Sequence, residues 1–398
     1  MAICTGFAKG AYFENQQVLN YELDQFQTCP IDIPLTCTNT TPVQNSCCFE
    51  SPGGIMLQTQ FWDYYPPIGD NETFTLHGLW PDNCDGSYEQ FCDDSLNLKQ
   101  NEVVDIIKNQ YKDEELVEFM KLNWKNFNGN DESLWTHEFN KHGTCIKTIR
   151  SKCFADYKEN ENVYKFFNIS VNLFKKYPTF KFLNEEGIIP SNDKTYTKEE
   201  ISNALKKNFD GKQVYFKCNK YNALQEIWYY HHLKGSLLNE DFVPIDSLIN
   251  SNCPNQGIKF IPKNQGFKPP PNQPPKSPNR GYLKLSNNPG CLISNGQWYQ
   301  YGTCATYQIN QLAFGGYNIK SSKGYCGIDS NDRLNCNSQN QPLRYQFHFD
   351  KELKEISYGS VNQWCFDDKG KHGHGKYVQV PIKLNKDNCE SPFTIKLV

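Results

Sequence analysis

The chain has 398 residues, of which 14% are Phe, Trp or Tyr, and its mean hydropathy is -0.70. So many aromatic rings favour packed cores over intrinsic disorder, and the length allows two domains. The formal net charge of -3 at pH 7 excludes a basic field over the whole protein. Any contact with nucleic acid must therefore come from a local site.

Residues 1–26 are predicted to be an N-terminal leader. They lack the apolar run of a signal peptide, so we expect that the signal was removed, replaced or omitted. The chain has 17 cysteines and no CxxC pair, which indicates disulfides in an oxidising compartment rather than zinc fingers or a thioredoxin-like site. Cys4, in the leader, is the odd one. No apolar run approaches the ~20 residues that span a membrane.

Three N-x-S/T sequons fit a glycoprotein of the secretory route, and they lie at Asn39, Asn71 and Asn168. Together with the cysteines, they predict a protein that is secreted or held in the vacuole lumen. At lower pH the carboxylates begin to protonate and the histidines become charged, so the net charge would turn positive. An acidic working compartment would fit that shift.

Residues 27–261 are predicted to form a first domain with mixed secondary structure. Four stretches are expected to be strands: 54–62, 73–79, 213–217 and 221–231. Helical periodicity covers 101–112 and 114–124, and Thr197-Lys198-Glu199-Glu200 is a capping box ahead of a further helix. Strands in sequence that are separated by a long helical insertion favour an α+β domain.

Residues 262–280 are predicted to be a Pro-rich linker. Prolines are frequent here, and such a run favours an extended polyproline conformation over helix or central strand. Residues 281–398 lack long helical periodicity and are predicted to form a mainly β domain. Apart from Cys4, ten cysteines precede the linker and six follow it, as two separately disulfide-bonded domains require. The alternative is a long surface loop within one domain.

Two short segments of the first domain carry residues suited to acid–base chemistry. The segment 74–81 predicts a strand, with alternation through His77 and a turn at Pro81. The segment 135–145 contains four further residues: His137, Glu138, Lys141 and His142. On a helix these four form one stripe, although a solvated charged face is the alternative for any one pair. The zinc-protease motif H-E-x-x-H is excluded, because Lys141 occupies the position of its second histidine.

Two histidines opposed across a cleft supply a base and an acid, and a lysine stabilises negative charge in the transition state. This combination suits cleavage of RNA by its own 2′-hydroxyl group, which needs no metal or other cofactor. DNA lacks that hydroxyl and cannot react in this way.

In this combination, and with the cysteine pattern around them, the two segments resemble the RNase T2 family of acid endoribonucleases. The resemblance covers about residues 27–260, and end to end the chain resembles fungal members with a C-terminal extension. It implies an α+β fold with a central antiparallel sheet flanked by helices, followed by a smaller, mainly β domain. It also implies cleavage of single-stranded RNA with low base specificity, through 2′,3′-cyclic phosphates to 3′-phosphates.

The resemblance assigns a role to each polar residue. His142 would be the general base and His77 the general acid, Glu138 and Lys141 would stabilise the pentacoordinate phosphorus, and His137 would hold the phosphate. Phe139 replaces a tryptophan that is common in the family, which leaves the proton chemistry intact. The resemblance also implies five disulfides: Cys29–Cys48, Cys37–Cys84, Cys47–Cys153, Cys92–Cys145 and Cys218–Cys253.

Trp80, Asp82 and Tyr88 match the first base pocket of the family, and Gln60 is expected to line the second. Because stacking on rings tolerates every base, we expect weak sequence preference. Core packing is the alternative for Trp80.

Other residues give weaker predictions. His372-Gly373-His374 is predicted to be a plain loop rather than a metal site, and His231-His232 to serve packing or the surface. The C-terminal domain leaves open a binding or toxin-like protein, or a module that protects or tethers the enzyme. Four of its rings are candidates for stacking on cell-wall carbohydrate: Trp298, Tyr299, Tyr301 and Trp364. We expect a monomer whose partner is single-stranded RNA.

Overall fold

The computed structural model describes residues 29, 33–38, 47–127, 129–263, 279–312, 316–340, 344–359, 361–367, 378–386 and 389–398. The leader, Cys4, Asn39, most of the Pro-rich segment and His372-Gly373-His374 lie outside the described residues. The chain divides into two compact units, and the main boundary in the sequence lies between residues 265 and 266.

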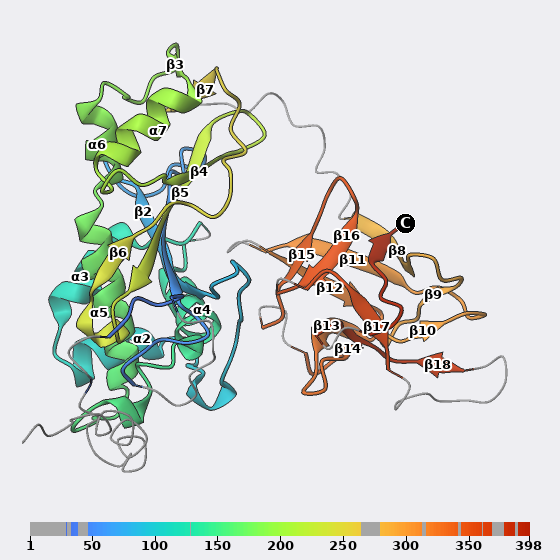
Figure 1. Cartoon of the computed structure of the whole chain (residues 1–398). Coiled ribbons are helices and arrows are strands. Elements are labelled where there is room, and N and C mark those ends of the chain that lie inside the picture. Colours follow the sequence, from blue (N-terminus) through green and yellow to red (C-terminus); the bar gives the residue numbers. More distant parts are fainter. Residues whose placement is uncertain are drawn as a thin grey trace, which may run out of the picture. The chain divides into compact units, whose positions relative to one another are not determined.

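The first unit contains a five-stranded antiparallel sheet (Figure 1). Its strand order is β2-β1-β5-β4, and β6 also pairs with β5. The strands are β1 (Ile55–Phe61), β2 (Thr75–Asp82), β4 (Tyr215–Cys218), β5 (Leu224–Leu233) and β6 (Phe242–Pro244). The four expected strands are therefore confirmed, with shifted ends.

The turn expected at Pro81 is wrong, because β2 continues through Pro81, which pairs with Met56 of β1. This is possible because β2 lies at the edge of the sheet. A proline in an edge strand removes no hydrogen bond from the ladder when its nitrogen faces outward.

Helices follow the first two strands in sequence, and α5 packs on β1 and β2. The expected helix 101–112 is only partly confirmed, since a single α-turn continues as a π-helix. Elsewhere the expected elements are confirmed: α3 covers 114–123, and the capping box of Thr197 and Glu200 opens α7. The helices are α2 (Glu102–Val104), the π-helix η2 (Asp105–Gln110), α3 (Glu114–Asn123), α4 (Asp131–Lys141), α5 (Glu161–Lys176), α6 (Thr179–Glu185) and α7 (Lys198–Lys207).

Short elements complete this unit. They are the 3-10 turns η1 (Asp94–Leu96), η3 (Gly143–Cys145), η4 (Ser151–Cys153) and η5 (Leu237–Asn239), and the paired strands β3 (Thr195–Tyr196) and β7 (Ile258–Lys259). Of these, η3 directly follows the helix that carries the second polar segment.

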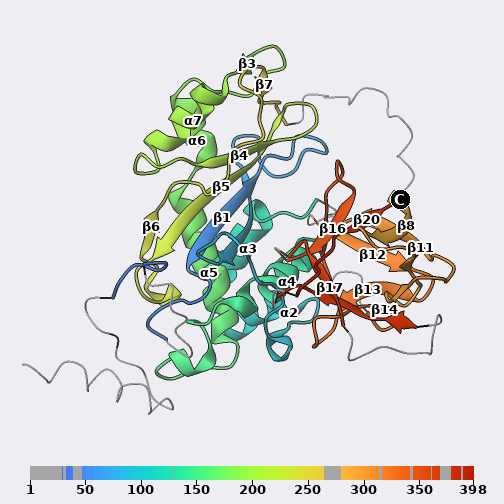
Figure 2. The same ribbon diagram turned by 45° about the vertical axis from the view of Figure 1, so that its right-hand side comes forward.

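The second unit has strands and no helix among its described residues, which confirms the mainly β prediction (Figure 2). Six strands are paired in the order β11-β8-β20-β16-β15-β12, and β12 pairs back with β11. The ring is therefore closed, which leaves none of these six with an unpaired edge. The hairpin of β13 and β14 extends from β12.

The strands of the second unit are β8 (Asn279–Leu285), β9 (Cys291–Leu292), β10 (Trp298–Tyr299), β11 (Thr306–Gln311), β12 (Tyr317–Ser321), β13 (Gly324–Ile328), β14 (Leu334–Asn337), β15 (Phe347–Phe349), β16 (Glu355–Tyr358), β17 (Trp364–Phe366), β18 (Gln379–Val380), β19 (Ile382–Leu384) and β20 (Ile395–Leu397). Alternate residues of the ring strands face an apolar core that includes Tyr307, Ile319 and Ile356.

Eight disulfides join cysteines among the described residues, and each links two cysteines of the same unit. The first unit has the five pairs that the resemblance implies. The second unit has three, namely Cys291–Cys304, Cys326–Cys336 and Cys365–Cys389. A native disulfide of this kind typically contributes about 2–4 kcal/mol to stability.

Candidate active site

His77 is the extra residue of a β-bulge. In the pairing of β1 with β2, Thr59 pairs with Gly78 and Gln60 with Leu76, so the register skips His77. The expected alternation through His77 and Leu79 is therefore broken. A bulge turns the side chain of its extra residue toward a new direction, and here the His77 ring lies edge-on to Trp80, with ring centres 4.9 Å apart.

At the bulge, the main-chain carbonyl of His77 accepts a hydrogen bond from a side chain. Trp124 supplies this hydrogen bond, because its indole Nε1 donates to His77 O at 2.7 Å. Phe61 stacks on the other side of the bulge, with its ring centre 4.2 Å from that of His77. The backbone and the ring of His77 are thus both held by buried or half-buried aromatic side chains.

The helix α4 brings the second segment to β2. It begins at the Asn130 N-cap, whose side chain accepts from the backbone N–H of Ser133. It ends at Lys141, whose carbonyl accepts from Phe91 N at 3.0 Å. The disulfide Cys92–Cys145 ties the turn after α4 to the loop that follows β2. The end of α4 is therefore fixed beside the bulge.

Glu138 is the centre of the site. Its side chain is buried, its Oε1 lies 3.4 Å from Nε2 of His77, and its Oε2 lies 3.9 Å from Nε2 of His142. The indole Nε1 of Trp80 donates to the same Oε2 at 2.8 Å. Gly78 makes room for this arrangement, since a Cβ there would lie 2.1 Å from Oε2.

The charges around Glu138 keep it ionised. Burial alone would raise the pKa of this carboxyl group, but the charge and the hydrogen bond of His77 hold its pKa well below the usual range. A carboxylate that stays negative in acid can stabilise a proton on either neighbouring histidine.

His142 is buried against Trp80, and their stacked rings lie 5.1 Å apart. Burial, with the charge of Lys141, places the pKa of His142 well below its usual value, although Glu138 opposes this. Its Nε2 is buried and has no hydrogen-bond partner. A neutral imidazole with an unpaired nitrogen is suited to accept a proton.

His77 also has an unpaired buried nitrogen, Nδ1. Burial lowers the pKa of His137 to about 3, so this ring is neutral in moderate acid, and it lies edge-on to Phe91. Burial also lowers the pKa of Lys141, against the charges of Glu138 and Asp82. The three predicted polar residues of α4, its C-cap residue His142 and His77 of β2 thus interact electrostatically, as one group.

Asp82 and Tyr88 are paired by an isolated bridge at the end of β2. Burial raises the pKa of Asp82 to about 8, although Lys141 opposes the shift. Burial and the charge of Asp82 raise the pKa of Tyr88 to about 12. In acid, both side chains therefore carry a proton that can be donated to a ligand.

Gln60 does not belong to this group, which contradicts its predicted place in a second base pocket. Its side chain is fully buried. The amide nitrogen donates to Tyr177 O at 2.9 Å, and Thr179 Oγ1 donates to the amide oxygen at 2.6 Å. Because side chains alternate along β1 and Phe61 faces His77, Gln60 faces the opposite side of the sheet.

Two residues near His77 were missed in the sequence. Phe61 stacks on its ring, and the charge of His77 acts on Asp63, whose pKa burial raises to about 6 against the charges of Lys263 and His77. The alternation of Phe61, Trp62 and Asp63 in the sequence could have placed Phe61 and Asp63 on one side. Their nearness to His77 depends on the register of β1 and β2, in which Phe61 pairs with Thr75, and this register has no local sequence signal.

The remaining predicted residues are placed as follows. His231 is buried and contacts Tyr177 OH at 2.9 Å, as the packing prediction expects. Asn71 is exposed, whereas Asn168 is half-buried in α5 and accepts from Asn172. Trp364 is fully buried in the barrel core, so its predicted stacking on carbohydrate is wrong.

Of the other three rings proposed for carbohydrate, only Tyr301 is clearly exposed, at 63%, while Trp298 and Tyr299 are half-buried. Across the described ranges, no cluster of three or more His, Cys, Asp or Glu side chains is arranged to hold a metal ion. None of the helices described has the length and apolar character to cross a membrane.

Comparison with known proteins agrees with this geometry. The sequence model of the Ribonuclease T2 family matches residues 53–253, and that of the RNase T2-like C-terminal domain matches residues 275–397. A Ribonuclease T2-like protein of Debaryomyces hansenii is 62% identical over 365 residues, which cover 91% of this chain and 89% of that protein.

Two further matches cover a smaller share of the chain. Ribonuclease T2 of Aspergillus oryzae is 47% identical over 239 residues, covering 60% of this chain and 85% of that protein. The crystal structure of Actibind, described as a T2 ribonuclease, is 44% identical with a TM-score of 0.57, and covers 60% of this chain and 100% of its own. The chain therefore belongs to the Ribonuclease T2 family and is a T2-type ribonuclease.

Proposed function

We propose that this site cleaves single-stranded RNA internally, with low base specificity, by acid–base transphosphorylation. One observation carries the proposal: His77 and His142 flank the carboxylate of Glu138, and each histidine keeps one buried nitrogen without a partner. Two such nitrogens are what a base and an acid need in order to act in the same step.

In the first step, His142 Nε2 takes the proton of the 2′-hydroxyl. The 2′-oxygen forms a bond to phosphorus, the bond from phosphorus to the 5′-oxygen breaks, and His77 gives a proton to that oxygen. The low pKa of His142 keeps it neutral in acid, which suits the base. Lys141 and His137 stabilise the phosphorane-like transition state and hold the phosphate.

In the second step the roles reverse. Water gives a proton to His77 as its oxygen bonds to the phosphorus of the 2′,3′-cyclic phosphate. His142 returns its proton to the 2′-oxygen as that bond breaks, which leaves a 3′-phosphate. Glu138 stays ionised throughout and stabilises whichever imidazole is positively charged. The two histidines supply both proton transfers of each step.

Base recognition is assigned to Trp80, Asp82 and Tyr88. Trp80 is only half-buried, and His142 stacks on its ring while His77 and Trp228 lie edge-on to it, so a base would stack on the part of the ring that these three side chains leave exposed. The raised pKa of Asp82 supports a protonated carboxyl group that both donates to and accepts from a base edge. Stacking dominates such contacts, which supports weak base preference.

The working compartment is inferred from the disulfides. Eight of them require an oxidising environment, so we infer the secretory route, with secretion or the vacuole lumen as the destination. A monomer is sufficient for the reaction, because His77, Glu138 and His142 come from one chain.

Digestion of a uniform single-stranded RNA and of its DNA counterpart, in acid and with chelator, tests the mechanism. We expect cleavage of RNA only, products with 2′,3′-cyclic phosphate ends, and a loss of about 10²–10⁴-fold in both His77→Ala and His142→Ala. Activity that persists in His142→Ala would show that the base is misassigned. No cleavage by the folded, oxidised wild type would refute the proposal as a whole.

A further inference from the structure

The two units of the chain differ in charge. Residues 279–398 contain 14 Lys and Arg against 9 Asp and Glu, a net charge of +5, whereas the whole chain has -3. The rest of the chain is therefore strongly negative. A polyanion is attracted by the C-terminal unit and repelled by the remainder, apart from the local site.

Part of this positive charge lies on one continuous outer face of the barrel. In the strand register Arg280 pairs with Gln308, Gln308 with Lys320, and Lys320 with Tyr325. Residues paired directly across strands share a face of the sheet, so these four side chains form a row over β8, β11, β12 and β13. Tyr282 lies two residues beyond Arg280 on the same side of β8. We call these five residues the β8–β13 face.

The β8–β13 face is open to solvent. Arg280, Tyr282 and Lys320 are exposed, and Gln308 and Tyr325 are half-buried. The residues between them in sequence, such as Leu283, Tyr307 and Ile319, point into the apolar core. Three strand spacings of about 4.8 Å make the row about 14 Å long, which gives room for several nucleotides.

The cations of this face lack acidic partners. Elsewhere in the unit, Arg333 pairs with Asp367, Lys386 with Asp332 and Lys396 with Glu355. Within the described part of the chain, no carboxylate forms an ion pair with Arg280 or Lys320. Their charges are therefore available to an external anion.

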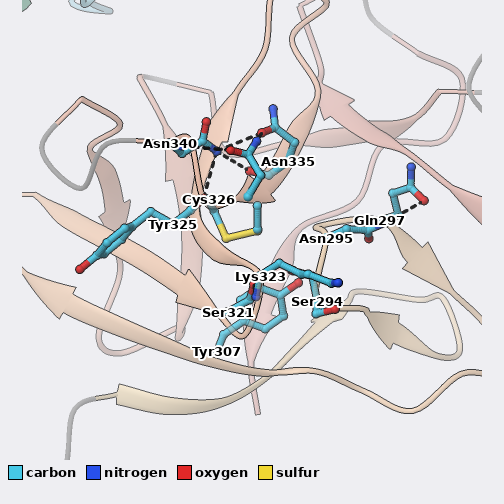
Figure 3. The surroundings of a disulfide bond; sticks show 12 residues. Ser294, Asn295, Gln297, Tyr307, Ser321, Lys323, Tyr325, Cys326, Asn335 and Asn340 are labelled. Carbon is cyan, nitrogen blue, oxygen red and sulfur yellow. Dashed lines mark hydrogen bonds between the residues drawn. A yellow bond between two sulfur atoms is a disulfide. The ribbon is translucent and has the colours of Figure 1, made fainter.

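Aromatic rings lie between these cations. Tyr282 is 44% exposed. The Tyr325 ring points away from the buried Cys326 and its disulfide (Figure 3), and Lys320 Nζ lies 5.0 Å from the centre of that ring. Cations that neutralise phosphates, next to rings on which bases stack, are the two features of surfaces that bind single-stranded nucleic acid without sequence preference.

We propose that the β8–β13 face binds single-stranded RNA and delivers it to the ribonuclease unit of the same chain. The role in delivery rests on the proposed function, whereas the binding does not. A neutral carbohydrate would use the rings but would gain nothing from the unpaired cations. Because both units belong to one chain, RNA held on this face has a raised effective concentration at the active site.

Binding is measured on the full chain with a labelled 2′-O-methyl RNA oligonucleotide, whose blocked 2′-oxygen cannot attack phosphorus. Arg280→Gln with Lys320→Gln should weaken binding roughly tenfold and lower the slope of log K against log salt by about 1.4, at ~0.7 per phosphate contact. The matched control is Lys351→Gln with Lys386→Gln, which removes the same charge from exposed positions elsewhere in the unit, and should change neither quantity.

The rings are tested separately. Tyr282→Ala should weaken binding by about tenfold, whereas Tyr282→Phe, which keeps the stacking surface, should bind like wild type. In cleavage assays, the double face variant should raise KM for a long RNA and leave kcat/KM for a dinucleotide unchanged, because a dinucleotide that binds directly at the active site needs no delivery from a second site.

Each outcome separates the two proposals. Equal binding by the face variant and the control would overturn this inference, even if wild type cleaves RNA. Binding of a sulfated polysaccharide, but not of the RNA analogue, at the face would also overturn it. If wild type failed to cleave RNA yet bound the analogue through the face, the inference would stand and the proposed function would fail.

Discussion

The two units of this protein differ in where their charged side chains lie: the ribonuclease unit buries those of its active site, and the C-terminal barrel exposes its own to solvent. In the ribonuclease unit the side chains of Glu138, His137 and His142 are buried close together, and their pKa values are strongly lowered. In the C-terminal barrel the core is apolar and the charges lie on the outer face. Burial suits groups that transfer protons, because charges act more strongly on one another away from water. Groups that bind a polymer must instead be accessible to that ligand. The following predictions test whether this contrast is real.

The largest expected effect comes from the carboxylates. Glu138→Gln keeps the shape of the side chain but removes the charge that stabilises the histidine cation, so kcat on RNA should fall about 10²–10³-fold. Glu355→Gln removes a partly exposed partner of Lys396 in the barrel, where ion pairs contribute little, and should leave kcat unchanged. Comparable losses in both variants, measured by initial rates, would contradict the contrast.

Two glycines give the next comparison. An added Cβ at Gly78 would lie 2.1 Å from Glu138 Oε2, and one at Gly281 would lie 2.3 Å from the Val398 carbonyl. Both Gly78→Ala and Gly281→Ala should lower the free energy of unfolding of their units by about 1–3 kcal/mol. Only Gly78→Ala should also lower kcat for a dinucleotide, since it displaces Glu138. Thermal unfolding and the rate of dinucleotide cleavage are measured for both variants. An equal loss of kcat in Gly281→Ala would contradict this prediction.

Histidine burial predicts a pH effect on stability. Burial lowers the pKa of His231 to about 3, against about 6.5 when unfolded. The unfolded state therefore binds more protons between pH 6.5 and 3, so stability falls as the pH falls through this range, by up to ~1.4 kcal/mol per pH unit. His231→Gln should lower the slope of unfolding free energy against pH by the contribution of about one proton, or about 1.4 kcal/mol per pH unit. His348→Gln, on the exposed surface of β15, should not, as denaturant titrations at several pH values will show.

Asp82 should give the smallest effect. Because burial raises its pKa to about 8, Asp82 is protonated in acid, and Asp82→Asn imitates that form. We expect kcat/KM for dinucleotides to change less than about tenfold below neutral pH. Between about pH 4, where Asp82 ionises in the unfolded chain, and about pH 8, only the folded state keeps the proton. The stability of wild type therefore falls as the pH rises through this range, whereas that of the variant does not. A large loss of activity in acid would show that the ionised form of Asp82 is needed.

Much of the secondary structure and the content of the site could be predicted from sequence. Period-2 and period-3.6 patterns predicted β1, β2 and α3, and the capping box predicted the start of α7. His77, Glu138 and His142 were selected because their side-chain chemistry is visible in the sequence. These predictions depend on neighbours a few residues apart, so no knowledge of packing was needed.

Other features depend on long-range contacts. The bulge at His77 arises in the pairing of two strands. His77 stacks on Phe61, on the side of Thr75, but Leu79 pairs with Gln58 and so faces the opposite side, against simple alternation. Gln60 was assigned to a base pocket, but its amide is bound on the far side of the sheet. Trp364 was expected to be exposed and is in the barrel core. In each case the facing of a side chain was decided by a partner distant in sequence.

The sequence by itself thus determined which chemical groups this protein has and on which local elements they lie. Only the tertiary structure decided which of these groups contact one another and which protonation state each of them has. Glu138 is ionised although it is buried, because Trp80 and His77, some 60 positions earlier in the chain, contact its carboxylate in the folded protein. The free energy of a charge depends on its solvation and its neighbours in space, and neither is written in local sequence.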